Sequence, residues 1–145
     1  TCTEDAAVLK LFGPGIGIKR DALPRVAAAL AAAGVTARAI VSSQTSINFI
    51  LHRGDLLRSA RVVKGLRLAV IDEIETNDDV ALVAIVGEGL LERTGIAARA
   101  IGAVARRRIN IQMISAGSSR VAGYFLVPRR DRTKAVRAIH TEFFG

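Results

Sequence analysis

The chain has 145 residues and a mass of 15.4 kDa, a length that suits one ordinary domain or two very small ones with a buried core. Hydrophobic residues make up 50% of it and charged residues 23%, and only 3 residues are Pro, which excludes bulk disorder. The formal charge is +8, but the arginines and lysines are scattered, which favours solvated helix and turn faces over a nucleic-acid surface.

The first half of the chain predicts six elements in the order strand, helix, strand, strand, helix, strand. They cover residues 6–12, 22–33, 35–41, 47–52, 56–64 and 68–74. Asp21 and Asp55 are the expected N-caps of the two helices, and Gly34 is the expected end of the first helix. A glycine loop at residues 13–17 precedes that helix, and the polar residues 42–46 form the expected hairpin loop.

The second half repeats this order at a period of about 75 residues. Its expected elements are a strand at 80–86, a helix from Thr94 or Gly95 to about residue 107, strands at 109–115 and 121–127, and a helix at 132–143 capped by Asp131. Gly13 and Gly15 match Gly87 and Gly89, each 74 positions on. Each copy predicts a ferredoxin-like βαββαβ module, with helices on one face of an antiparallel sheet, so the predicted fold class is α+β.

The two modules are expected at residues 6–75 and 80–145. The chain ends just after the second helix of the second copy, so the fourth strand of that copy is missing from its own half.

The first glycine loop is a candidate binding site. A dinucleotide is not favoured there, because several residues separate the loop from its helix and the third glycine of G-x-G-x-x-G is misplaced. A loop that enters a helix N-terminus presents free N–H groups and the positive end of the helix dipole, which suits a carboxylate. A small amino acid brings such a carboxylate. The loop of the second copy is interpreted as a structural turn.

The sequence shows no catalytic set and no metal cluster. The serines lack a nearby base, and His52 and His140 are interpreted as packing or surface residues. Asp72, Glu73 and Glu75 favour a solvated strand end over a metal site, because neighbours on a strand point to opposite faces.

One cysteine, Cys2, excludes an internal disulfide and a Cys/His zinc cluster. A reducing cytoplasm is therefore the expected compartment. No apolar stretch approaches the roughly 20 residues that cross a bilayer, so a membrane partner is not expected.

An RNA-binding protein of the same topology is the alternative function. Such modules stack bases on aromatic side chains exposed on the sheet. The second copy offers only Tyr124 and Phe125, which are adjacent and face opposite ways, and the first offers Phe49 alone. A non-enzymatic, ferredoxin-like RNA-binding protein is thus supported mainly by the charge.

Residues 83–127 and 134–144 resemble a known family. They read VAIVGEGLLERTGIAARAIGAVARRRINIQMISAGSSRVAGYFLV and KAVRAIHTEFF. The pieces V-G-E-G, T-G-I-A-A-R, I-N-I-Q-M-I-S and G-S-S resemble the ACT domains, a family of amino-acid-sensing modules. The whole chain resembles the C-terminal tandem regulatory region of the aspartate kinases, with a looser match in the first half.

The resemblance implies allosteric feedback inhibition by an end-product amino acid, lysine or threonine, bound to the first module. In the family a kinase domain that phosphorylates aspartate with ATP and Mg precedes this region. The chain alone is therefore expected to have no catalytic activity and no cofactor. The implied partners are the effector, the kinase domain and a second copy in a homodimer, without nucleic acid. The chain begins at Thr1 rather than Met, so we expect it to be part of a longer protein.

The resemblance also implies an effector site between the glycine loop with its helix start and the second strand with its hairpin. The positions that match the lysine-sensitive members are Ile16, Lys19, Asp21, Ala22, Leu23, Thr36, Ala37, Arg38, Ser42, Ser43 and Gln44. Backbone N–H groups of residues 21–23 would hold the carboxylate, and Ser42 and Ser43 would bond the polar ends of the ligand.

Arg38 departs from the family pattern. The lysine-sensitive members have an aspartate there that pairs with an amino group of lysine, and a guanidinium repels that group. Asp21, a glycine in the family, pairs either with Arg38 or with the amine of the ligand. Two alternatives to lysine sensitivity therefore stay open: a different effector amino acid, or loss of the response to an effector.

The family also implies how the second sheet is completed. The first module is inserted into the second, and the strand just before it supplies the missing fourth strand. Residues 1–3, Thr-Cys-Thr, fit the end of such a strand. The second module is therefore expected to include residues 1–4.

Overall fold

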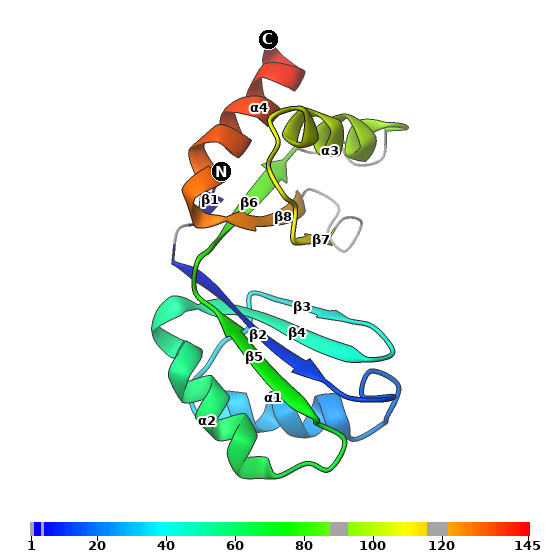
Figure 1. Ribbon diagram of the computed structural model, residues 1–145, viewed down its shortest axis with the longest axis vertical. Coiled ribbons are helices and arrows are strands. Elements are labelled where there is room, and N and C mark those ends of the chain that lie inside the picture. The colour runs from blue at the N-terminus through cyan, green and yellow to red at the C-terminus, as the bar shows by residue number, and fades with distance from the viewer. Residues whose placement is uncertain (1, 4, 88–92, 116–121) are drawn as a thin grey trace. The chain divides into compact units, whose positions relative to one another are not determined.

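The structure is a computed structural model that describes residues 2–3, 5–87, 93–115 and 122–145 (Figure 1). The chain divides into two compact units. The first unit is Asp5–Asp78, and the second unit combines Thr1–Glu4 with Asp79–Gly145.

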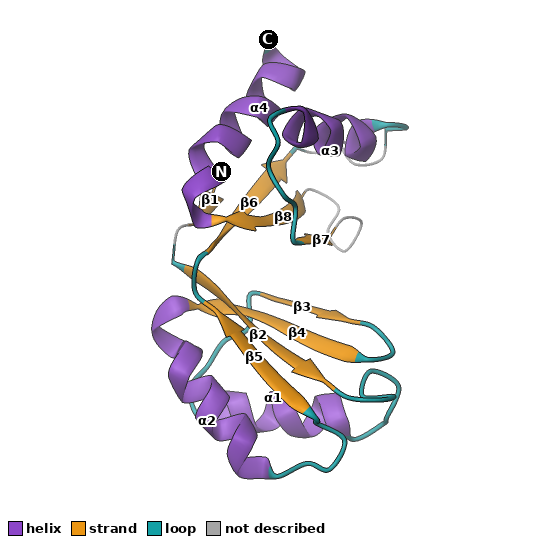
Figure 2. Cartoon of the chain, in the orientation of Figure 1, coloured by secondary structure: helices purple, strands orange, loops and turns teal. Residues whose placement is uncertain are grey.

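The first unit is a four-stranded antiparallel sheet covered on one face by two helices (Figure 2). Its elements are β2 (Ala6–Phe12), α1 (Ala22–Ala32), β3 (Ala39–Ser42), β4 (Ser46–His52), α2 (Leu56–Leu66) and β5 (Glu73–Asn77). The strand order is β3-β4-β2-β5. Alternate residues of β2, Ala7, Leu9 and Leu11, join Phe49 of β4 and Val26 of α1 in one core, as the two-residue period of a strand requires.

The second unit repeats this architecture. Its elements are β1 (Cys2–Thr3), β6 (Val80–Val86), α3 (Ile96–Arg106), β7 (Met113–Ser115), β8 (Ala122–Pro128) and α4 (Arg132–Phe144). The strand order is β1-β6-β8-β7, and the core joins Val83, Ala100, Val104, Phe125 and Ile139. The predicted α+β class, with two ferredoxin-like modules, is confirmed.

The strand β1 supplies the fourth position of the second sheet. Cys2 pairs with Val83 and Thr3 with Leu82, antiparallel to β6. The first unit therefore lies in the chain between β1 and the rest of the unit to which β1 belongs, which is the inserted arrangement that the family resemblance implies.

The predicted strand at residues 68–74 is wrong. The strand β5 begins at Glu73 and pairs with β2 from Phe12 to Val8. Leu68 and Ile71 pack instead on the edge of the core, and Ile71 N–H donates to Leu68 O at 3.1 Å in a turn. The apolar alternation that suggested a strand therefore comes from a loop that covers the core.

The strands β3 and β7 begin later than the patterns at 35–41 and 109–115 predict. Val35 N–H donates to Leu30 O at 2.9 Å, and Ile109 N–H donates to Val104 O at 3.5 Å. In each copy, the first apolar residue after the helix thus closes the helix end, and both residues are buried. The strand begins only after that closure.

The expected N-cap side chains do not cap their helices. Neither Asp21, Asp55 nor Asp131 makes a side-chain cap hydrogen bond. The Asp55 carboxylate instead accepts from Arg58 Nη2 at 2.7 Å. Gly34, with φ of 77°, ends α1 as predicted, because a left-handed backbone favours glycine. Two predicted positions lie outside the described residues: Val121, the first residue of the strand expected at 121–127, and Gly89 of the second glycine loop.

No helix in the described ranges is long and apolar enough to cross a membrane.

Gly13, the first residue after β2, packs closely against two other backbone segments at the start of the glycine loop. Its N–H donates to Thr45 O at 3.0 Å. A Cβ atom at this position would lie 1.7 Å from the backbone oxygen of Val70, closer than any real contact. The residue is therefore a glycine because two backbone segments pass it at close range.

We predict that Gly13→Ala destabilises the first unit by about 1–3 kcal/mol, the usual cost of overpacking a filled site. Gly65→Ala is the control, since nothing lies within 4 Å of a Cβ there and alanine favours a helix. Urea unfolding measures both. Equal stability of Gly13→Ala and the wild type would contradict the packing described here.

Candidate functional site

The predicted effector residues fall into two groups at opposite ends of the first sheet. One group lies at the glycine loop, the start of α1 and the β3–β4 hairpin, and comprises Ile16, Lys19, Asp21, Ala22, Leu23, Ser42, Ser43 and Gln44. The other group, Thr36, Ala37 and Arg38, precedes β3. Arg38 and Ser43 are separated by the length of β3, roughly 15 Å at the usual rise of a strand.

Backbone contacts hold the glycine loop and the hairpin together. Gly17 N–H donates to Gln44 O at 3.2 Å. A Cβ atom at Gly17 would lie 1.6 Å from Ser43 O, so only glycine allows the approach. The structure thus brings the loop half of the predicted site against its hairpin half.

The side chains at this end divide into buried and exposed sets. Ile16 and Ala22 belong to the core, with 0% and 2% exposure, and Leu23 packs against it. Ile16 and Ala22 therefore offer a ligand their backbone only, while the Leu23 side chain is partly exposed. The exposed side chains are those of Lys19, Asp21, Ser42, Ser43 and Gln44.

The N–H groups of Ala22 and Leu23 stand in the first turn of α1, where no preceding helical carbonyl is available to them. Pro24 has no N–H group. The positive end of the helix dipole adds to the field at this point. The start of α1 thus presents N–H groups and a positive dipole end of the kind that a carboxylate accepts.

Ser43 organises the hairpin. Its Oγ lies 2.9 Å from Ser46 Oγ and accepts from Thr45 N–H at 3.3 Å. The hydroxyl of Ser43 thus helps to fix the turn, while Ser42 is exposed at the end of β3 and pairs with Ile47 of β4.

At the other end of the sheet, Arg38 pairs with Asp5 rather than with Asp21. Arg38 Nη1 donates to Asp5 Oδ1 at 3.1 Å. The second oxygen of the same carboxylate, Oδ2, lies 2.7 Å from His52 Nε2. Gly54 N–H donates to His52 Nδ1 at 3.1 Å, so Nε2 is the ring nitrogen that carries the proton toward Asp5.

The hydrogen bond from the Arg38 guanidinium is the main cause that holds the pKa of Asp5 below its ordinary value. The charges of Arg38 and His52 act in the same direction, and desolvation opposes them. Sequence reasoning missed Asp5, and it placed His52 only as a packing or surface residue. The strand register, which sets Ala6 opposite His52, brings the two together.

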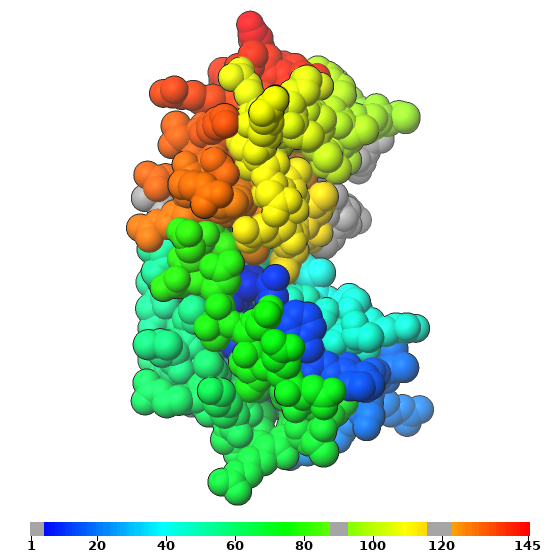
Figure 3. Space-filling view, in the orientation of Figure 1, coloured from blue at the N-terminus to red at the C-terminus, as the bar shows by residue number. Residues whose placement is uncertain are grey.

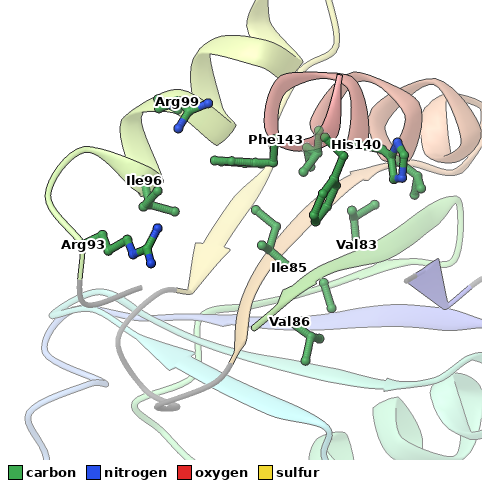
Figure 4. Close-up of a pocket in the computed structure, with 12 residues that line it drawn as sticks. Val83, Ile85, Val86, Arg93, Ile96, Arg99, His140 and Phe143 are labelled. Atoms are coloured by element: carbon green, nitrogen blue, oxygen red, sulfur yellow. The ribbon is translucent and has the colours of Figure 1, made fainter. Parts of the chain in front are cut away.

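The second unit contains an apolar cavity that the sequence did not indicate (Figure 4). Its volume is about 440 Å³, and β6, α3 and α4 line it through Val83, Ile85, Ile96, Ile139 and Phe143. Arg99 at its margin is already engaged, with Nε 3.1 Å from Glu142 Oε1 and the guanidinium 4.7 Å from the Phe143 ring. The cavity thus offers a ligand mainly apolar surface.

None of the three aromatic residues that the sequence offered for base stacking is fully exposed on its sheet. Phe49 is fully buried, Phe125 is 4% exposed, and both belong to the cores. Tyr124 is half-buried. Nor do the residues that the structure describes include a group of three His, Cys, Asp or Glu side chains that could hold a metal ion.

Comparison with known proteins adds the family context. The family described as ACT domain matches residues 83–143. An aspartokinase of Pseudomonas aeruginosa is 33% identical over 155 residues, which cover 97% of this chain and 34% of that protein. The chain spans only 25% and 19% of the length of two other relatives, aspartokinase 3 of Bacillus subtilis and a bifunctional aspartokinase/homoserine dehydrogenase of Haemophilus influenzae.

Two solved structures are similar in fold over nearly the whole chain. The ligand-free regulatory subunit of aspartate kinase from Thermus thermophilus has a TM-score of 0.88 at 25% identity, and the match covers 99% of this chain and 95% of that one. Aspartokinase III of E. coli, in complex with lysine and aspartate, has a TM-score of 0.79 at 25% identity, over 99% of this chain and 32% of that one.

The Asp5 cluster predicts an acid-sensitive contribution to stability. Because the folded state lowers the pKa of Asp5, the contribution is complete above the ordinary pKa of an aspartate and is lost as the pH falls through the lower folded value. Asp5→Asn should therefore lower the melting temperature at neutral pH, and the difference from the wild type should shrink below about pH 4. Melting curves from acid to neutral pH measure this.

Asp72→Asn serves as the control, because Asp72 is exposed and remote from Arg38 and His52. A melting difference between Asp5→Asn and the wild type that stayed constant down to the acid limit would exclude the proposed electrostatic cause.

Proposed function

Because this chain belongs to the regulatory ACT regions of the aspartate kinases, we propose that it binds an end-product amino acid and controls a kinase domain to which it is joined. The observation that carries the proposal is the glycine loop, held against the β3–β4 hairpin beside the free first turn of α1. The two ACT modules supply sensing, and the chemistry, transfer of phosphate from ATP to aspartate, belongs to the kinase domain.

The effector site that we propose lies in the first unit. The N–H groups of Ala22 and Leu23 would bind the effector carboxylate, supported by the dipole of α1. The exposed side chains of Asp21, Ser42 and Gln44 lie at the same end of the sheet and would meet the amino group and the polar end of the ligand. This assignment uses the loop and hairpin half of the predicted residues.

The second group of predicted residues has a different role in this proposal. Arg38 is tied to Asp5, and the length of β3 separates it from the hairpin. Within a single chain, one ligand therefore cannot contact both Arg38 and Ser42. We assign Arg38 a structural role: its ion pair with Asp5 stabilises the end of the sheet that lies away from the hairpin.

Lysine and threonine are the effectors to test first. The lysine complex of E. coli aspartokinase III, which shares the fold, supports lysine. Asp21 is the one exposed carboxylate among the candidate residues and would take the side-chain amine of lysine. Threonine needs no such second carboxylate, and the serine hydroxyls of the hairpin suit its hydroxyl group. Binding would act on the kinase by favouring one of two states, in the cytoplasm.

We further propose that the chain forms a homodimer through sheet edges. The strands β3 and β7 are edge strands of their sheets. Each presents an exposed isoleucine at an equivalent position of the repeat, Ile40 at 45% and Ile114 at 42% exposure. An apolar edge strand is a ready template for pairing with another chain.

The effector proposal predicts a ligand-induced gain in thermal stability. A saturating effector at 100 times its Kd stabilises the folded state by about 2.7 kcal/mol. We expect lysine or threonine to raise the melting temperature. Asp21→Ala should weaken the shift by removing a ligand contact, and Ser43→Ala by loosening the hairpin.

Thr76→Ala, an exposed change on β5, should leave the ligand response unchanged. Calorimetric titration of the same variants gives the affinities directly. Absence of a response to every proteinogenic amino acid would refute the effector site and leave the family membership in place.

The assembly proposal predicts a dimer by light scattering at micromolar concentration. Ile40→Lys or Ile114→Lys should shift the mass toward the monomer, because a lysine on an edge strand opposes strand pairing. Leu57→Lys, on α2 at 72% exposure, should leave the mass unchanged. A monomeric wild type, or dimers that resist both edge substitutions, would sink this proposal.

A further inference from the structure

A basic hollow lies on the surface of the second unit. It has a volume of about 610 Å³ and is lined by the end of α3, the turn before α4, and α4 itself. In Figure 3, the orange surface of that turn and of α4 adjoins the yellow surface of the segment that follows α3. Four cationic side chains line the hollow, those of Arg107, Arg130, Lys134 and Arg137.

These four cations have no carboxylate partner among the residues that the structure describes. The only carboxylate of α4, Glu142, is already shared by Arg99, at 3.1 Å, and Arg106, at 2.8 Å. No acidic residue lines the hollow. The four cations are therefore not ion-paired within the described part of the unit, although Asp131 follows Arg130 in the same turn.

The spacing of the cations concentrates this charge. Lys134 and Arg137 lie three residues apart on α4, which places their side chains about 5–6 Å apart on one helical face, and Arg130 joins them from the turn before α4. Like charges at such intervals destabilise a helix. A bound polyanion would relieve that repulsion.

The remaining lining favours an anion with phosphate oxygens over the stacked bases of a nucleic acid. Thr133 and Thr141 add hydroxyl donors to the hollow. Among the described residues that line it there is no Phe, Tyr or Trp, and the ring of His140 packs on Phe144 with a centroid distance of 5.0 Å. The hollow thus has donors for anionic oxygens and no free aromatic platform for stacking bases.

We propose that this hollow binds a chain of phosphate groups, either an inorganic polyphosphate or the phosphate tail of a nucleotide. Arginine and lysine are the side chains that recognise phosphate oxygens most strongly, by charge-assisted hydrogen bonds. Several phosphates in one chain match several cations around one hollow, which a single monovalent anion does not. The site lies in the second unit and shares no residue with the proposed amino-acid site.

The test is calorimetric titration of the chain with inorganic tripolyphosphate. We expect binding that weakens between about 50 mM and 200 mM salt, as the release of counterions requires. The double variant Arg130→Gln/Arg137→Gln should lose at least about tenfold in affinity, since two charge-assisted contacts are removed.

The control variant is Arg25→Gln/Arg61→Gln, which removes the same charge from two exposed positions of the first unit. It should bind tripolyphosphate as the wild type does. Circular dichroism verifies that both variants fold. ATP and tripolyphosphate are compared in parallel: equal affinities identify the phosphate chain as the ligand, and tighter binding of ATP identifies a nucleotide tail.

Three results would overturn the proposal. They are no binding of tripolyphosphate at low salt, an equal loss in the two double variants, and binding of single-stranded RNA alone with an affinity that grows with its length. The second result would mean that net charge, rather than the hollow, attracts the anion.

Discussion

The close approach of the glycine loop to the β3–β4 hairpin is the constraint on which the candidate site depends. Gly17 lies so near the Ser43 carbonyl that no side chain fits between them. This contact fixes where the chain turns into α1, and so where the free N–H groups of the first helical turn stand relative to the hairpin. The binding chemistry follows from backbone placement more than from any one side chain.

A second constraint acts at the other end of the first sheet. Asp5, the first residue of the first unit, accepts from Arg38 and His52 through its side chain and from Arg53 through its backbone. Arg53 Nε also donates to the carbonyl of Asp78, the last residue of the unit, at 3.1 Å. Both ends of the inserted segment, Asp5 and Asp78, are thus hydrogen-bonded to Arg53 in the turn that follows β4.

Much of the fold could be predicted from the sequence, because the repeat and the apolar periods are strong local signals. The helices and the strands β2, β4 and β6 occur close to their predicted positions. The strand predicted at 68–74 failed because the loop residues Leu68 and Ile71 cover the core with the same alternation that a strand would show. The local alternation of apolar and polar residues does not distinguish a hydrogen-bonded strand from a loop that packs on the core.

The site was predictable only in part, for a related reason. The loop, the helix start and the hairpin follow from glycine spacing and the family resemblance. The Asp5–Arg38 pair joins residues 33 positions apart and depends on a strand register that the sequence does not specify. The same holds for the cations around the basic hollow, which converge from the end of α3, the turn before α4 and α4 itself. Contacts between residues of different helices and strands can be identified only once the fold is known.

Nuclear magnetic resonance of the labelled chain, titrated with lysine and with threonine, tests whether the first helical turn and the hairpin form the binding site. We expect one of these amino acids to move the amide signals of Ala22, Leu23 and Gln44, while those of β8 in the second unit stay unchanged. No movement of these amides at millimolar ligand, or movement confined to the second unit, would contradict this binding site.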